Sequence, residues 1–143
     1  MRILALDLGD RRIGVALSDE TGTLASPLAT LTRTGGRKDA AAVALLVRQH
    51  GAAEVVVGLP LNMDGTQGEQ AQKALVFAEA LRRRAGVPVV TCDERLTTVE
   101  AEERLREAGL GWRERKRRVD EAAAVVILQE YLDRRPVGSG RGR

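Results

Sequence analysis

Residues 3–22 read ILALDLGDRRIGVALSDETG, and this stretch decides the fold. An apolar run ends at Asp7, a glycine-flanked turn with Asp10, Arg11 and Arg12 follows, and a second β-rich run begins directly after the turn. Two such runs joined by so short a loop predict an antiparallel hairpin. An acid placed where a buried strand stops either hydrogen-bonds the turn or marks a metal-binding site.

The rest of the chain continues this hairpin into an α/β pattern. Periodicity and turn residues predict strands at 2–8, 12–19, 24–32, 53–60 and 87–94, and helices at 38–51, 69–86, 99–109 and 119–134. The first three strands form an antiparallel meander, and right-handed crossovers add the last two on the other side of the first strand. We therefore expect a mixed five-stranded sheet in the order 3-2-1-4-5 with helices on both faces.

Two local expectations accompany this architecture. Thr66 with Glu69 forms a sequence pattern typical of a capping box at the start of the second predicted helix. Residues 1–135 are expected to form one domain, and residues 136–143 to form a flexible basic tail.

The composition limits the classes of function. The 143 residues carry a formal net charge of +3 and only one Phe, one Trp and one Tyr, which disfavours a surface that stacks many bases on aromatic rings. One cysteine and one histidine exclude an internal disulfide and a His-rich zinc site. No signal peptide or membrane span is recognisable, so a cytoplasmic protein with no membrane partner is expected.

Acidic residues mark the candidate site. Sites in open α/β sheets lie at the carboxyl ends of parallel strands, where the sequence places Asp7, Asp93 and Glu94. Asp120 begins the last helix and shares a face with Ala124, Ile127 and Tyr131, so it is expected to point towards the sheet. Together these acids favour a carboxylate site for Mg²⁺ or Mn²⁺, which suits phosphodiester hydrolysis.

Each acid also has a structural explanation on its own. Asp7 can hydrogen-bond the turn that follows it, and Asp93 or Glu94 can pair with Arg95. Asp120 can be a first-turn acid that the helix dipole favours.

Four segments resemble one known family over residues 5–132. They read ALDLGDRRIGVALSD (5–19), VVVGLPLNMDGTQG (55–68), DERLTTVEAEERL (93–105) and DEAAAVVILQEYL (120–132). In order and spacing they are similar to the signature blocks of the YqgF (RuvX) family of small bacterial proteins with a ribonuclease-H-like fold. That family is described as Holliday-junction resolvases and as nucleases that process the 5′ end of pre-16S rRNA. The resemblance implies that Asp7, Glu94 and Asp120 are the catalytic carboxylates and hold a divalent metal.

The second acid is open between two neighbouring residues. In related resolvases it usually ends the fourth strand, where this chain has Gly58-Leu59-Pro60. The fifth strand lies two inter-strand steps from the first, roughly 9–10 Å away. Glu94 has the longer side chain and is favoured, and Asp93 is the alternate.

Basic residues near these acids are candidates for substrate binding. Arg11 and Arg12 lie in the first turn, Arg95 follows Glu94, and Asn62 stands in the loop after the fourth strand. The basic run before the last helix adds Arg115, Lys116 and Arg117. Such residues contact phosphates without reading a sequence. The structural alternatives are that Asn62 stabilises a turn and that the basic run is the solvated start of a helix.

Three functions compete for this pattern. The favoured function is a metal-dependent nuclease acting on RNA or branched DNA, with processing of the pre-16S rRNA 5′ end ahead of junction cleavage. A non-catalytic nucleic-acid-binding assembly factor is the first rival, and an ATP-binding domain of the actin and sugar-kinase type is the second. Junction cleavage normally needs two active sites, yet no apolar dimer face is readable, so a monomer or weak homodimer is expected.

Overall fold

A computed structural model describes residues 1–94 and 119–134 of the chain. Its elements, in chain order, are β1 (Arg2–Leu8), β2 (Arg12–Ser18), β3 (Ala25–Thr32), α1 (Gly36–His50), β4 (Ala52–Leu59), α2 (Glu69–Ala85), β5 (Val89–Asp93) and α5 (Val119–Arg134). The helix expected at 99–109 and the tail at 136–143 lie outside the described residues. The division into a domain and a tail therefore stays a prediction.

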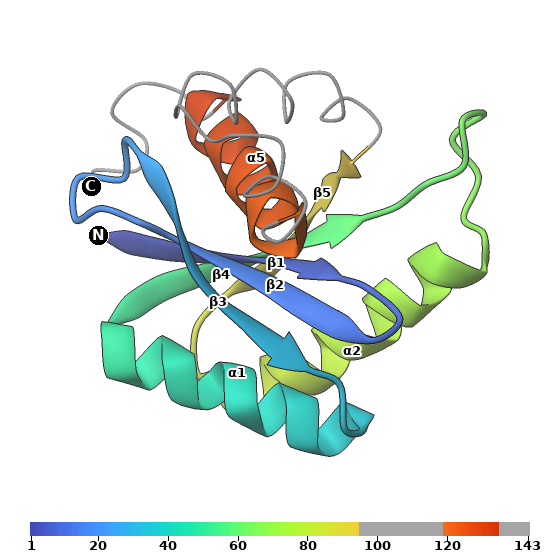
Figure 1. The fold of residues 1–143 in the computed structure, drawn as a ribbon, viewed down its shortest axis with the longest axis horizontal. Coiled ribbons are helices and arrows are strands. Elements are labelled where there is room, and N and C mark those ends of the chain that lie inside the picture. The colour runs from blue at the N-terminus through green and yellow to red at the C-terminus, as the bar shows by residue number, and fades with distance from the viewer. Residues whose placement is uncertain (95–118, 135–143) are drawn as a thin grey trace.

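The five strands form one sheet in the order β3-β2-β1-β4-β5, which confirms the predicted order. β1 pairs antiparallel with β2, and β2 with β3, whereas β1–β4 and β4–β5 are parallel. The carboxyl ends of β1, β4 and β5 therefore lie at one end of the sheet, on the right in Figure 1.

Helices cover both faces of this sheet, as expected (Figure 1). α1 and α2 pack side by side on one face over an apolar core that includes Leu4, Leu6 and Leu81. On the other face α5 contacts β1, β2, β3 and β4. Successive side chains of β1 therefore point alternately to the α1–α2 pair and to α5.

The face of α5 that packs on the sheet is the apolar stripe expected from the sequence. Ala124, Ile127 and Leu128 are at most 1% exposed and pack on the inner side chains of β1 and β4. The buried amide of Gln129 fixes this helix against the edge strand. It accepts a hydrogen bond from Ala25 N at 3.0 Å and donates one to Thr23 O at 2.9 Å. The helix is thus held in register with the sheet.

The capping box expected at Thr66 and Glu69 is wrong. α2 begins at Glu69 with Gly68 as its N-cap and has no side-chain cap. The Thr66 hydroxyl instead donates to Asp64 Oδ1 at 2.6 Å, because the loop before the helix folds on itself and uses that group.

Within residues 1–94 and 119–134, no helix has both the length and the apolar character needed to cross a membrane.

Candidate active site

Asp7 lies near the carboxyl end of β1, opposite Gly14 of β2. Along β1 it alternates with Ala5, whose side chain packs in the core beneath α5. The Asp7 carboxylate therefore belongs to the α5 face of the sheet. The buried Leu6 and the partly buried Leu8 point to the α1–α2 face.

Glu94 follows β5 directly, and its side chain reaches Asp7 across the intervening strand β4. A hydrogen bond joins the two carboxyl groups, which requires one of them to hold a proton. Burial, then the Asp7 charge, then this hydrogen bond raise the pKa of Glu94 to about 8. Near neutral pH Glu94 therefore carries the shared proton, and its carboxyl O–H donates a hydrogen bond to the Asp7 carboxylate.

Gly58 of β4 makes this reach possible. It is buried between Asp7 and Glu94, and a Cβ at this position would lie 2.5 Å from Glu94 Oε2 and 2.6 Å from Ile127 Cδ1. Any side chain here would collide with the carboxyl group that crosses the strand. Sequence reasoning treated Gly58 as a strand end, although an isolated glycine at the end of a β-rich run is a signal of close approach.

Asp93, the alternate to Glu94, lies elsewhere. It pairs with Leu59 of β4, whose side chain packs on the α1–α2 core. Strand alternation directs Asp93 to that face, away from Asp7. Its charge still contributes to the raised pKa of Glu94, behind the contributions of burial and Asp7.

The third candidate acid, Asp120, is the second residue of α5, and its side chain lies outside the described part of the chain. In Figure 1 the first turn of α5 lies towards the end of the sheet where β1 and β4 finish. The described residues alone contain no group of three metal-binding side chains. They supply a pair of carboxyl groups facing the helix that carries Asp120.

The structure describes some of the candidate substrate-binding residues and not others. Arg11 and Arg12 are exposed in the turn after Asp7. Asn62 is exposed, but its amide holds the loop together by donating to Thr66 Oγ1 at 2.9 Å. The remaining candidates lie outside the described residues: Arg95, Arg115, Lys116 and Arg117.

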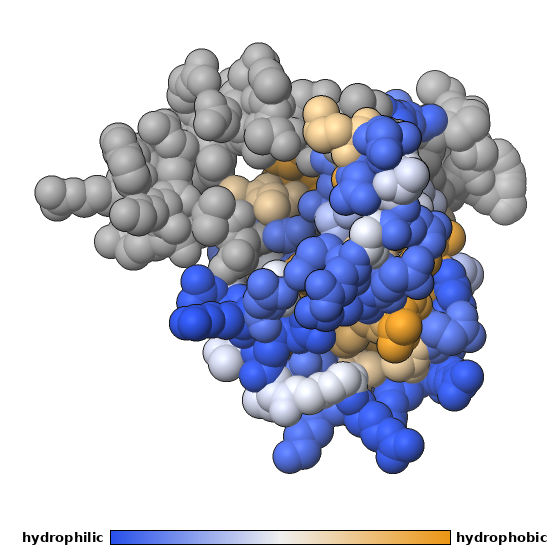
Figure 2. Space-filling view, turned by 90° about the vertical axis from the view of Figure 1, so that its right-hand side faces the viewer, coloured by the Kyte–Doolittle hydropathy of each residue, from blue (hydrophilic) through white to orange (hydrophobic). Residues whose placement is uncertain are grey.

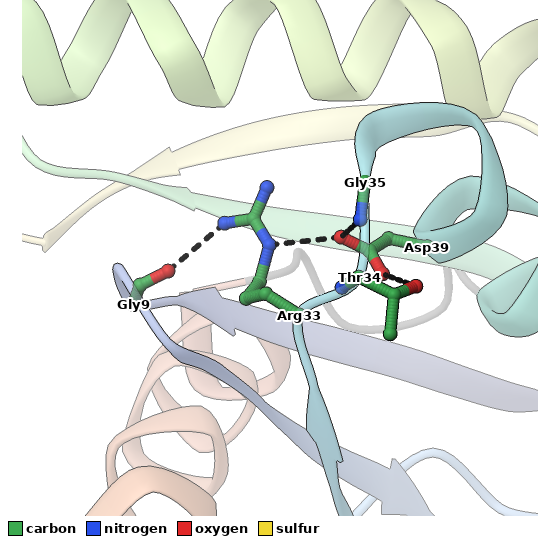
Figure 3. A network of polar contacts seen from close by, with 5 residues as sticks. All are labelled: Gly9, Arg33, Thr34, Gly35 and Asp39. Carbon is green, nitrogen blue, oxygen red and sulfur yellow. Dashed lines mark hydrogen bonds and ion pairs between the residues drawn. The ribbon is translucent and has the colours of Figure 1, made fainter.

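A partly buried ion pair supports the turn that carries Arg11 and Arg12, and sequence reasoning missed it (Figure 3). Arg33 Nε lies 3.0 Å from Asp39 Oδ2, while Arg33 Nη1 donates to Gly9 O at 2.9 Å. The Arg33 backbone N–H donates to Arg11 O at 2.8 Å. This Arg33–Asp39 clasp ties the β1–β2 turn to the start of α1. Separated by five residues of loop and helix, the two residues offer no periodic signal.

Asp39 is fully engaged within the clasp. Its side chain is 4% exposed and accepts hydrogen bonds from Thr34 N, Thr34 Oγ1 and Gly35 N besides Arg33. Burial alone would raise the pKa of Asp39, but these donors outweigh burial and lower it. The carboxylate is thus charged and compensated inside the fold.

The Asp7–Glu94 pair is suited to a divalent cation. Two carboxyl groups share one proton at a half-buried site because both cannot carry charge side by side. A cation that replaced the proton would remove this repulsion, and oxygen ligands are those that hard divalent ions prefer. At this end of the molecule the described residues present mostly hydrophilic side chains, with smaller apolar areas among them (Figure 2).

Comparisons with known proteins identify the family to which the chain is similar. The family model described as "RuvX: Holliday junction resolvase" matches residues 1–134. A protein of Desulforudis audaxviator named "Putative pre-16S rRNA nuclease" is 49% identical over 138 residues, covering 96% of this chain and 98% of its own. A protein of the same name from Anaeromyxobacter sp. (strain Fw109-5) is 51% identical over 135 residues, covering 94% and 98%.

Solved structures with low sequence identity share the fold. Thermus thermophilus RuvC in complex with a Holliday junction substrate has a TM-score of 0.64 at 20% identity and covers 90% of each chain. The fowlpox virus resolvase in complex with Holliday junction DNA has a TM-score of 0.59 at 12% identity, covering 93% and 97%. The described sheet and helices therefore have the ribonuclease-H-like fold that the sequence resemblance implied.

Proposed function

The chain belongs to the RuvX family, and on this premise we propose that it is a divalent-metal-dependent nuclease that hydrolyses phosphodiester bonds of structured nucleic acid. The observation that carries the proposal is the Asp7–Glu94 pair, which shares a proton above Gly58 at the carboxyl end of the sheet. A structural salt bridge or turn contact would not place two acids together in this way.

The chemistry of the donors identifies the metal class. Asp7 and Glu94, with Asp120 as the proposed third ligand, offer only carboxylate oxygens, which favours Mg²⁺ or Mn²⁺. Glu94 must release its proton when the cation binds, so binding is coupled to pH. When bound, such ions activate a water molecule and stabilise the leaving oxygen of an in-line displacement.

The basic residues around the acids hold the substrate. Arg11 and Arg12 contact phosphates next to the scissile bond, because the exposed turn that carries them follows Asp7 directly. We assign the same role to Arg95, Arg115, Lys116 and Arg117, which lie outside the described residues. We assign to Asn62 a place beside the bound nucleic-acid strand. Contacts of this kind position a nucleic acid without selecting its sequence.

The name of the relatives favours RNA as the substrate. Proteins about half identical to this chain are named for pre-16S rRNA, so we propose processing of the 5′ end of that precursor in the bacterial cytoplasm. The family description favours Holliday junction cleavage as the second candidate. One copy suffices to cut one RNA strand, whereas symmetric junction cleavage needs two copies, and we propose a monomer or weak homodimer.

A cleavage assay tests the proposal. Wild type is incubated with a labelled 16S-precursor fragment, a single-stranded RNA and a four-way DNA junction, each with Mg²⁺, with Mn²⁺ or with chelator. Asp7→Asn is the test variant. Asp10→Asn is the matched control, because Asp10 lies in the turn that follows β1 and its carboxylate accepts a hydrogen bond from Gln70 of α2, not from Glu94.

The expected result is metal-dependent cleavage by wild type and Asp10→Asn, and background cleavage by a folded Asp7→Asn. Preference for the precursor fragment supports the RNA role, and preference for the junction supports the second candidate. Equal products from wild type and Asp7→Asn, or no products at all, would overturn the nuclease and favour a binding factor.

A further inference from the structure

Two groups of basic residues lie at opposite ends of the helices beneath the sheet. Arg37 and Lys38 are exposed in the first turn of α1, whereas Arg82, Arg83 and Arg84 occupy the last turn of α2. The dipole of a helix favours cations at its C-terminus and disfavours them at its N-terminus. The α2 group therefore stabilises its own helix, but the α1 group does not.

The acid nearest to Arg37 and Lys38 cannot compensate them. Asp39 is the acidic residue in the first turn of α1, and its charge is already compensated by Arg33 in the clasp. Its carboxylate is buried and accepts from Arg33 and from the backbone of Thr34. The positive charge of Arg37 and Lys38 therefore faces solvent at a helix end that opposes it, which points to an anion outside the protein.

The clasp also places these cations at the same end of the molecule as the candidate active site. Arg33 bonds the backbone of Gly9 and of Arg11, so the start of α1 is fixed next to the β1–β2 turn (Figure 3). A cavity of about 330 Å³ lies between this turn and α2, and Arg33 and Lys73 line it. Hydrophilic side chains project along the lower edge of Figure 2, where α1 and α2 lie.

Two further acids near this edge already have partners within the described residues. Asp10 is engaged with Gln70, and Glu69 lies 4.0 Å from Lys73. Neither of these acids belongs to the helix turn that carries Arg37 and Lys38. The exposed cations Arg11, Arg37 and Lys38 thus lie on two elements, the β1–β2 turn and the first turn of α1.

We propose that Arg11, Arg37 and Lys38 form one cationic edge that contacts the sugar–phosphate backbone of the nucleic acid beyond the strand being cut. The proposal rests on the proposed function and extends the substrate path to the α1 side of the sheet. A polynucleotide suits this edge better than a small anion because its charges repeat along its length, as the cations do across two elements.

The test compares two double variants with the same charge change. Arg37→Gln with Lys38→Gln removes two cations from the proposed edge, and Arg83→Gln with Arg84→Gln removes two exposed cations from the far end of α2. Glutamine has a similar helix propensity to both residues, and thermal melts confirm folding. Both pairs are made in the Asp7→Asn background, so that the nucleic acid stays intact.

Binding of the four-way junction and of the 16S-precursor fragment is measured from 50 to 200 mM salt. For the Arg37/Lys38 pair, the slope of log K against log salt should fall by about 1.4–1.8, because each lost phosphate contact contributes about 0.7–0.9. Affinity at 100 mM salt should fall about tenfold or more, and the Arg83/Arg84 pair should match its parent.

Equal changes in both double variants would mean a net-charge effect and would overturn the edge, as would no change in either. The outcome is separable from the proposed function. A selective loss of binding in the Arg37/Lys38 pair, without metal-dependent cleavage by wild type, would keep the edge and reject the nuclease. Metal-dependent cleavage by wild type, without a selective loss of binding in this pair, would keep the nuclease and reject the edge.

Discussion

The two faces of the sheet differ in what their residues do. On the α1–α2 face the buried side chains form a continuous apolar core, and Asp39, the one buried acid among the described residues, is compensated by the clasp. On the α5 face, Gly58 leaves space at the end of the sheet that the Glu94 carboxyl group fills. The comparison teaches that one face compensates its buried acid within the fold, while the other omits a side chain to bring two acids together.

The largest expected effect concerns stability on the α1–α2 face. Leu81 of α2 is fully buried, so Leu81→Ala should lower the free energy of unfolding by about 2–5 kcal/mol through lost burial and a cavity. Urea denaturation measures this change. Cleavage per folded molecule should stay at the wild-type rate, since the site lies on the other face.

Val76→Ala is the control for this change, because Val76 is on the same helix but 69% exposed. It should alter stability by less than about 0.5 kcal/mol. A loss of cleavage by folded Leu81→Ala would contradict the division of tasks between the two faces.

The next effect concerns Gly58 on the α5 face. In Gly58→Ala the new methyl group meets Glu94 and Ile127, so we expect metal affinity to fall about 10–100-fold, as when groups that orient ligands are changed. Overpacking should also cost about 1–3 kcal/mol of stability. Titration with Mn²⁺ and urea denaturation measure the two quantities.

Gly36→Ala is the matched control, since nothing lies within 4 Å of a Cβ at Gly36 and its φ is not positive. It should bind metal as wild type does. Wild-type metal affinity in Gly58→Ala would show that Glu94 need not cross β4 at this point.

The remaining expected effect is a pH dependence of opposite sign on the two faces, measured as the free energy of unfolding of the metal-free protein. The pKa of Glu94 is raised from 4.5 to about 8, so the folded state binds a proton that the unfolded state releases, and stability falls as pH rises between these values. The pKa of Asp39 is lowered, so its contribution is present above its unfolded pKa and is lost as pH falls through its folded pKa.

Glu94→Gln should therefore flatten the stability profile between about pH 5 and pH 8, and Asp39→Asn should flatten it only in the acid range below about pH 4. Urea denaturation at several pH values, with chelator present, makes the measurement. A profile of Glu94→Gln that still falls towards pH 8 as steeply as wild type would contradict the assignment.

Regular patterns made the sheet predictable. The strand order follows from period, turn residues and crossover handedness, and the stripe of Ala124 and Ile127 correctly placed the packed face of α5. Strand ends likewise indicated that Asp7 neighbours Glu94, with Asp93 as the alternate, and the structure brings Asp7 and Glu94 into contact. These features depend on spacing along the chain, which a single sequence displays directly.

The features that sequence reasoning missed depend on contacts between distant segments. Gly58 matters only because a side chain from another strand crosses it, and Arg33 with Asp39 matters through the backbone of Gly9. The mistaken capping box at Thr66 has the same origin, since Asp64 competes for its hydroxyl in three dimensions. Helix and turn propensities depend on residues that are neighbours in the sequence, so they do not describe these contacts.

The glycine beneath Glu94 also constrains how this chain can be redesigned. Because a Cβ at position 58 would lie 2.5 Å from Glu94 Oε2, a side chain there and the present position of the Glu94 carboxyl group exclude each other. A designer who moves the acid from the end of β5 to the end of β4 must therefore change both positions together.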